Sequence, residues 1–230
     1  MAALEVRLAP GAPSRGYPWH LPAVRSLPIE LDPHVTLFVG ENGSGKSTLI
    51  EAMAVVAGLN PEGGSWQVDF STEDSHSPLV EHLRFSADRR IRPGWFLRAE
   101  SFYNVATYRV RNPRPGGDET NYHEVSHGES FLAVAREWFA DDRFFVLDEP
   151  EAALSFRGQL ALIQAVLDGV AAGGQFVIAT HSPLLMALPG ARVVELTDDG
   201  ATPRSYDELE VVDLWRSFLD EPERFLRHLG

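Results

Sequence analysis

The amino-acid sequence predicts an α/β fold, in which a mostly parallel β-sheet carries helices on both of its faces. Short apolar runs typical of strands buried on both faces recur at 35–39, 143–147 and 176–179. Helical patterns alternate with these runs, as they do in chains that build parallel sheets. Polar residues directly follow each run, and ligands of such sheets bind at the carboxyl ends of the strands.

The other elements follow from apolar periodicity and from residues that stop helices. Alternation of apolar and polar residues at 4–9 predicts a half-exposed strand, and 192–196 is expected to be an edge strand. Further strands are expected at 29–31 and 95–99. Glycines that follow helical patterns mark the ends of two helices. Helices are expected from 46 to about 58, at 131–139, at 156–170 and at 207–228.

Three stretches rich in proline, glycine or polar residues are expected to be irregular, at 10–28, 60–82 and 105–121, the last two as surface loops. Within the first, Tyr17 and Trp19 are expected to pack in the core. Stacking of one of them on an adenine ring is the alternative. The chain, 1–230, is expected to form one domain, because its length suits a single large core.

Residues 84–98 interleave arginine with aromatic residues, a pattern that can mark nucleic-acid contact. We expect a strand with a solvated basic flank instead, because the formal charge of −13 disfavours unassisted binding to nucleic acid or anionic membrane. The chain has no cysteine, which excludes disulfides and thiolate metal sites. It also has no membrane-length apolar run and no signal-peptide pattern, so a cytoplasmic protein is expected.

The segment from Gly40 to Ser47 matches the phosphate-binding loop pattern G-x-x-x-x-G-K-S, with a buried strand before it and a helix after it. The glycines let backbone N–H groups surround phosphate oxygens, and the helix N-terminus adds a positive dipole end. Lys46 would reach the β- and γ-phosphates, and the Ser47 hydroxyl would hold Mg²⁺. The residues expected to contact the nucleotide here are Glu41, Asn42, Gly43, Ser44, Gly45, Lys46, Ser47 and Thr48.

Lys46 is the only lysine among the 20 basic residues of the chain. A compact ammonium suits a phosphate at this position better than a planar guanidinium fork does. The alternative is a plain strand–helix turn, which the full pattern in its proper context disfavours. The sequence therefore predicts a nucleotide-binding protein.

Two more polar motifs follow predicted strands: Asp148-Glu149 after 143–147, and His181 after 176–179. Four hydrophobic residues followed by an acidic pair are the usual second half of a phosphate-loop site, in which Asp148 would hold Mg²⁺ through water. Glu149 would polarise a water for in-line attack on the γ-phosphate, and His181 would contact that phosphate or orient the water. The alternatives are a helix-capping turn and an ordinary hydrogen-bonding histidine.

Five motifs follow one another along the chain. They are 40–47, Ser126-His-Gly-Glu129, Val146-Leu-Asp-Glu-Pro150, Ala153-Leu-Ser155 and Thr180-His-Ser182. This series resembles the Walker A, signature, Walker B, D-loop and H-loop motifs of ABC-type ATPases, over nearly the whole chain. Within that superfamily the chain resembles small stand-alone ATPases related to SMC and RecF-type nucleotide domains. The resemblance implies a P-loop NTPase fold with an N-terminal antiparallel β portion, and Mg²⁺-dependent hydrolysis of ATP.

For the signature segment, the resemblance implies a composite site. Ser126, Gly128 and Glu129 would bind the γ-phosphate of an ATP held by a second copy of the chain. Two chains would then sandwich two ATP molecules head to tail and part after hydrolysis. The family also has a glutamine near the metal, and Gln67 lies too early to serve. Glu100, at the end of the strand expected at 95–99, is the expected substitute as a metal ligand.

Four functions remain open at this point. The first is an ATPase whose ATP-dependent dimerisation drives another process. The second is the ATP-binding subunit of a membrane transporter, which would be expected to carry the glutamine near the metal that this chain lacks. The third is a nucleotide-gated module of repair or defence type, bound to DNA or to an unidentified protein. The fourth is a P-loop kinase, in which the signature and His181 would have no role.

Overall fold

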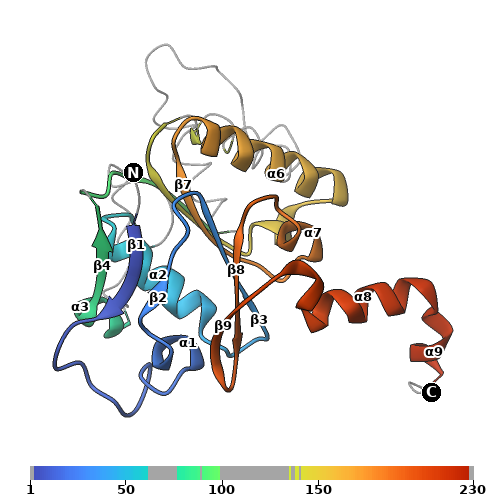
Figure 1. Ribbon diagram of the computed structural model, residues 1–230, viewed down its shortest axis with the longest axis horizontal. Helices are drawn as coiled ribbons and strands as arrows, with labels where there is room; N and C mark the ends of the chain where they lie inside the picture. The colour runs from blue at the N-terminus through green and yellow to red at the C-terminus, as the bar shows by residue number, and fades with distance from the viewer. Residues whose placement is uncertain are drawn as a thin grey trace.

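The computed structural model describes residues 3–61, 77–88, 90–98, 135, 138–139 and 141–227, which build two sheets (Figure 1). The larger sheet has the strand order β5-β6-β7-β3-β8-β9, and all neighbours pair in parallel except β8 and β9. The predicted parallel sheet is thereby confirmed. Its strands are β3 (Val35–Gly40), β5 (Pro93–Arg98), β6 (Phe144–Asp148), β7 (Gln175–Ala179), β8 (Arg192–Thr197) and β9 (Gly200–Arg204).

The smaller sheet is antiparallel and contains β1 (Ala3–Leu8), β2 (Ile29–Glu30) and β4 (Leu83–Ala87). It confirms the expected N-terminal antiparallel portion. The buried amide of Gln175 joins it to the larger sheet, because the Gln175 Oε1 accepts from the N–H of Ala3 at 2.8 Å. The Nε2 of the same side chain donates to the carbonyls of Ala3 and Asp32, each at 2.8 Å.

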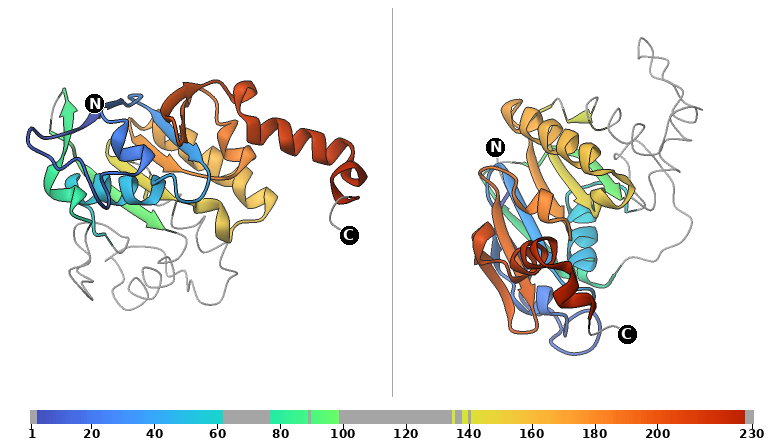
Figure 2. Two further views of the ribbon diagram at one scale, coloured as in Figure 1. Left: turned by 90° about the horizontal axis from the view of Figure 1, so that it is seen from below. Right: turned by 90° about the vertical axis from the view of Figure 1, so that its right-hand side faces the viewer.

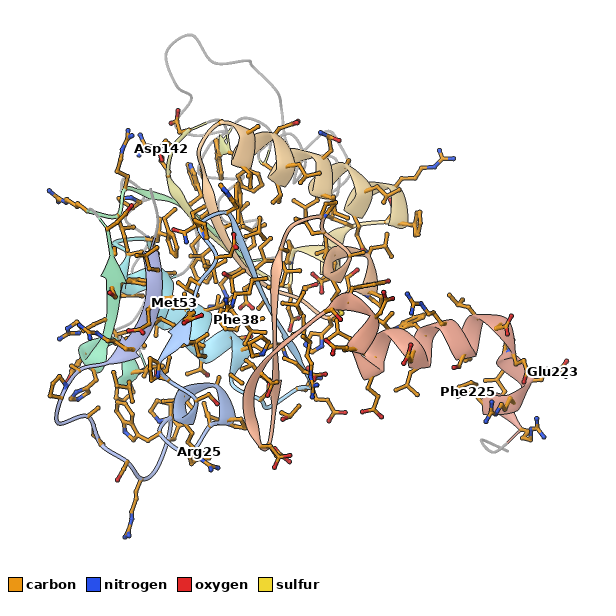
Figure 3. The ribbon with its side chains drawn as sticks, in the orientation of Figure 1. Arg25, Phe38, Met53, Asp142, Glu223 and Phe225 are labelled. Carbon is orange, nitrogen blue, oxygen red and sulfur yellow. The ribbon has the colours of Figure 1, made fainter. Side chains whose placement is uncertain are left out.

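Helices pack on both faces of the larger sheet because its strands are apolar on both faces. Leu37 and Phe145 point into one cluster with α6 (Phe156–Ala171), whereas Phe38 points into the other with α2 (Lys46–Val56). Figure 3 labels two members of the second cluster, Phe38 of β3 and Met53 of α2. The other described helices are α1 (Pro22–Arg25), α3 (Leu79–His82), α7 (Pro183–Met186), α8 (Glu210–Asp220), α9 (Pro222–Leu226), and the 3₁₀ turns η1 (Pro150–Ala153) and η2 (Tyr206–Glu208).

Four predictions about elements are wrong. Residues 22–25, expected to be irregular within 10–28, form α1 with Ala23 and Val24 buried. The strand β8 is not an edge strand, because β9 pairs with it beyond the turn at 198–199. The helix expected at 207–228 is divided into η2, α8 and α9, since Pro222 cannot continue the hydrogen bonding of α8. Residues 79–82, expected within a surface loop, form α3 with a buried Leu79. The loop expected at 105–121 and most of the helix expected at 131–139 lie outside the described residues.

Figures 1 and 2 show α8 and α9 extending away from the rest of the described chain. Several of their apolar side chains are exposed, namely Leu214, Trp215, Leu219 and Leu226. Among the described residues, no helix combines the length and the apolar character that crossing a membrane requires.

Replacing Gln175 by methionine tests the junction between the two sheets. The substitution keeps the side-chain volume but leaves the N–H and carbonyl of Ala3 without their partners, and a buried unpaired group costs about 1–3 kcal/mol. We expect the free energy of unfolding, measured in urea, to fall by about 3 kcal/mol. The control is Gln164→Met on the exposed side of α6, expected to change stability by less than about 0.5 kcal/mol. Equal unfolding midpoints for the two variants would contradict this account.

Candidate nucleotide-binding site

The polar motifs predicted to act together follow three strands that are neighbours in the larger sheet. β7 lies between β3 and β6, so Thr180 and His181 emerge between the phosphate loop and the acidic pair Asp148-Glu149. The two outer motifs also meet across this gap, because Ser47 Oγ donates to Asp148 Oδ1 at 3.2 Å. The parallel sheet therefore brings the predicted residues to one edge.

The loop before α2 curls through glycines in left-handed conformations. Gly43 and Gly45 have φ values of 86° and 91°, which side chains other than glycine rarely adopt. At Gly40 a Cβ would lie 2.3 Å from the carbonyl oxygen of Leu196, so only glycine fits beside β8. α2 begins at Lys46 without a side-chain cap, which leaves the first N–H groups of the helix for an anion.

Lys46 is buried at the centre of this loop and is only 4% exposed. Its Nζ donates to the carbonyls of Gly40 and Glu41, each at 2.8 Å. Burial lowers the pKa of Lys46, while the negative charges of Glu149 and Asp148 act in the opposite direction. Among the described residues no carboxylate lies within ion-pairing distance of the ammonium. An anionic ligand would offset the cost of burying this charge.

A cavity of about 270 Å³ lies over the phosphate loop. It is lined by Tyr17, Leu21, Asn42, Gly43, Gly45, Lys46, Ser47, Thr48 and Glu149. Trp19 is buried and packs edge-on against His82, as expected for a core residue. The prediction that Tyr17 packs in the core is wrong: this side chain is 60% exposed, with its hydroxyl 3.4 Å from Thr48 Oγ1. A tyrosine can expose its polar end and still offer a ring face to a ligand.

Asp148 is buried at the end of β6 and lies beside an arginine that the sequence analysis did not assign to the site. Arg98 Nε is 3.6 Å from Asp148 Oδ2, and Arg98 Nη1 donates to Glu51 Oε2 at 3.1 Å. The residue was missed because it was interpreted as part of a solvated basic flank. The oxygens of Ser47 and Asp148 suit Mg²⁺, which takes oxygen ligands and needs only one or two from protein when phosphates supply others.

Glu149 and His181 form a pair at the edge of the cavity. Glu149 Oε1 lies 3.2 Å from His181 Nε2, and that buried nitrogen has no hydrogen-bond partner among the described residues. Glu149 has φ 47° and ψ 50°, the one positive φ outside glycine in the described part of the chain. Such a conformation costs of order 1 kcal/mol and recurs at functional sites.

Glu151 is a second residue that the sequence analysis did not single out. Its carboxylate accepts a hydrogen bond from the N–H of His181 at 2.6 Å. The available signal was a third acidic residue in the run Asp-Glu-Pro-Glu, two positions after Glu149. The predicted contacts of Glu100, Ser126, Gly128 and Glu129 lie outside the described residues.

Comparisons with known proteins agree with this geometry. A family profile described as "AAA domain" matches residues 16–94, which include the phosphate loop. A second, described as "AAA domain, putative AbiEii toxin, Type IV TA system", matches residues 71–187, which include the acidic pair and His181. The fold resembles that of a nucleotide-free ATP-binding cassette from an ABC transporter, with a TM-score of 0.54 and 17% identity over 94% of this chain and 96% of that one.

Two relatives found by sequence comparison are described as ATP-binding export proteins. The cytochrome c biogenesis ATP-binding export protein CcmA of Rhodopseudomonas palustris is 29% identical over 165 residues, which cover 64% of this chain and 77% of that protein. CcmA of Salmonella typhi is 29% identical over 181 residues, which cover 70% of this chain and 83% of that protein. The second profile spans more than half of the chain, and together these findings show that the chain belongs to the AAA/ABC-type P-loop ATPases.

Proposed function

We propose that this protein binds ATP and Mg²⁺ in the cavity over the phosphate loop and hydrolyses the ATP to ADP and phosphate. The observation that carries the proposal is the meeting of three groups at one sheet edge: the buried Lys46 ammonium, the Ser47–Asp148 contact and the Glu149–His181 pair. A plain strand–helix turn would require neither the Ser47–Asp148 contact nor the Glu149–His181 pair. A phosphate-loop kinase would not require His181.

The phosphates of ATP would lie against the loop from Glu41 to Thr48. Its N–H groups and the start of α2 offer positive ends of dipoles, and Lys46 adds a full charge next to the β- and γ-phosphates. Tyr17 lines the same cavity with its ring exposed, and it would stack on the adenine.

Ser47 and Asp148 would hold Mg²⁺ between the loop and the end of β6. When bound, the ion would supply positive charge that neutralises part of the charge on the phosphates. Arg98 would hold the carboxylate of Asp148 in place from the side of β5, because its guanidinium reaches both Asp148 and Glu51. Glu100 remains a proposed metal ligand.

Glu149 would orient the attacking water. Its carboxylate would accept a hydrogen bond from a water placed in line with the bond between the γ-phosphorus and the β–γ bridging oxygen. As the new oxygen–phosphorus bond forms, the bridging bond breaks, and ADP and inorganic phosphate result. The Nε2 of His181, which lies 3.2 Å from Glu149 Oε1 but makes no hydrogen bond among the described residues, would donate to the γ-phosphate and hold it during this step.

The site is open on one side, and a second chain would close it. The side chain of Glu149 is 42% exposed and Tyr17 is 60% exposed, whereas phosphoryl transfer benefits from excluding bulk water. From the resemblance to ABC-type ATPases, we expect Ser126, Gly128 and Glu129 of the partner to cover the site. A two-fold dimer with two such sites is the expected assembly.

A transporter subunit is the second candidate, and the names of the CcmA relatives favour it. In that case ATP-driven pairing would work on a membrane partner. The DNA-binding alternative has less support within 90–98, because Arg98 turns into the site and Arg92 lies 3.6 Å from Asp142.

Two substitutions separate binding from turnover. Glu149→Gln keeps the shape of the side chain but weakens its hold on the water, so we expect ATP turnover to fall at least about 100-fold with ATP affinity retained. Lys46→Ala removes the buried ammonium and is expected to abolish ATP binding. Isothermal calorimetry and phosphate release measure the two properties. Turnover by Glu149→Gln at the rate of the parent would show that another group orients the water.

Tyr17→Ala tests the adenine contact. Loss of an aromatic stacking partner is worth about 1 kcal/mol, so we expect the Kd for ATP to rise by about five- to tenfold. Tyr17→Phe keeps the ring and loses only the contact with Thr48, and its Kd should stay within about twofold of the parent. An equal Kd for the alanine variant and the parent would place the adenine elsewhere.

A further inference from the structure

We propose that Glu151 is a positioning residue that acts through His181. Its carboxylate fixes the backbone of the segment 180–182 and thereby holds the imidazole of His181 against Glu149. This inference rests on the proposed ATPase function for its consequence. The arrangement itself stands on the contacts of Glu151.

One oxygen of Glu151 receives three hydrogen bonds from consecutive residues. Oε1 accepts from Thr180 Oγ1 at 2.7 Å, from the N–H of His181 at 2.6 Å and from the N–H of Ser182 at 3.1 Å. Hydrogen bonds to a carboxylate are about twice as strong as neutral ones. A single side chain thus determines where the backbone on both sides of His181 lies.

The backbone of this segment leaves the sheet and needs side-chain partners. The last ladder bond here is donated by the N–H of Thr180 to the carbonyl of Phe38, at 3.1 Å. β7 has ended at Ala179 and α7 has not begun, so the N–H groups of His181 and Ser182 point out of regular structure. Donors that are buried without partners are costly. Glu151 accepts from the N–H of His181, and it shares the N–H of Ser182 with Thr180 Oγ1, which lies 3.0 Å away.

The turn at Glu149 explains how Glu151 reaches this position. The N–H of Glu149 donates to the carbonyl of Ala179 at 3.0 Å, which ties the end of β6 to the end of β7. The left-handed conformation of Glu149 then turns the chain into η1, and Glu151 lies over the end of β7. Glu149 and the residue that places its partner His181 therefore belong to the same short turn.

A second contact holds the other side of the segment. Ser182 Oγ donates to Gln159 Oε1 of α6 and accepts from the N–H of Leu184 at 3.2 Å. Ser182 is therefore fixed from α6, and its N–H is held by Glu151 Oε1 at 3.1 Å and by Thr180 Oγ1 at 3.0 Å. The backbone of His181 is thus held on both sides, and its side-chain Nε2 lies 3.2 Å from Glu149 Oε1.

Glu151 does not line the nucleotide cavity, yet this arrangement gives it a role in turnover. Loss of its carboxylate would leave the residues that line the cavity, Lys46 among them, in place, so ATP should still bind. The imidazole would no longer be held in one place, and the transfer step would suffer. Loss of a residue that only stabilised the fold would not lower the rate of the transfer step while leaving ATP affinity unchanged.

A double-mutant cycle of Glu151→Ala and His181→Ala tests the proposal. We expect Glu151→Ala to lower kcat by about 10- to 100-fold with the KM for ATP within about twofold. In the His181→Ala background the same substitution should lower kcat by less than about twofold, because its target is already gone. Glu151→Gln keeps an acceptor oxygen and should retain most of the activity. Glu30→Ala, at an exposed ion pair of β2, is the matched control and should leave kcat unchanged.

Hydrogen–deuterium exchange of the segment 180–182 gives a readout that needs no ATP hydrolysis. We expect the amide of His181 to exchange at least about tenfold faster in Glu151→Ala than in the parent or in Glu151→Gln. The amide of Ser182 keeps Thr180 Oγ1 as an acceptor at 3.0 Å, so its exchange should rise less. Unchanged exchange, or losses in kcat that add fully in the double variant, would overturn the proposal. If the parent does not hydrolyse ATP, only the proposed ATPase function is wrong. The exchange result still decides whether Glu151 holds the segment 180–182. If Glu151→Ala does not fold, Glu151→Asp, one methylene too short, takes its place with the same expected losses.

Discussion

The parallel pairing of β7 between β3 and β6 is the constraint on which the site depends. It sets the phosphate loop, the segment after Ala179 and the acidic pair side by side at one edge. The bond from Ser47 to Asp148 spans this arrangement, and the N–H of Glu149 is tied to β7 through the carbonyl of Ala179. Apolar residues on both faces of these strands, held by α2 and α6, keep that edge in register.

Charge is distributed at this edge in a way that favours an anionic ligand. Lys46 is buried without an ion-pair partner among the described residues, and its pKa is lowered by that burial. Three of the carboxylates whose charges act on Lys46 have other partners. Glu149 lies beside His181, Asp148 lies beside Ser47 and Arg98, and Glu151 accepts from the segment 180–182. A triphosphate would supply the negative charge that the ammonium of Lys46 has no ion-pair partner to provide. Much of the geometry for binding is therefore present before the ligand arrives.

The sequence predicted the parts of this site that depend on local pattern. The glycine spacing of the phosphate loop, the apolar runs of β3, β6 and β7, and the polar residues at their ends are all local signals. Tyr17, Arg98 and Glu151 were misplaced or missed because their roles depend on tertiary contacts. The exposure of Tyr17, the turn of Arg98 toward Asp148 and the reach of Glu151 to His181 all follow from the packing of distant segments. The same reason explains β8, which becomes an inner strand only because β9 folds back on it.

We propose that ATP completes its site by joining two chains. This can be measured as the mass in solution of the Glu149→Gln protein, by light scattering with and without ATP and Mg²⁺, with Lys46→Ala in parallel. We expect Glu149→Gln to be a monomer alone and a dimer with ATP and Mg²⁺, whereas Lys46→Ala should stay a monomer in both. A Glu149→Gln protein that binds ATP and remains a monomer would show that ATP does not join two chains.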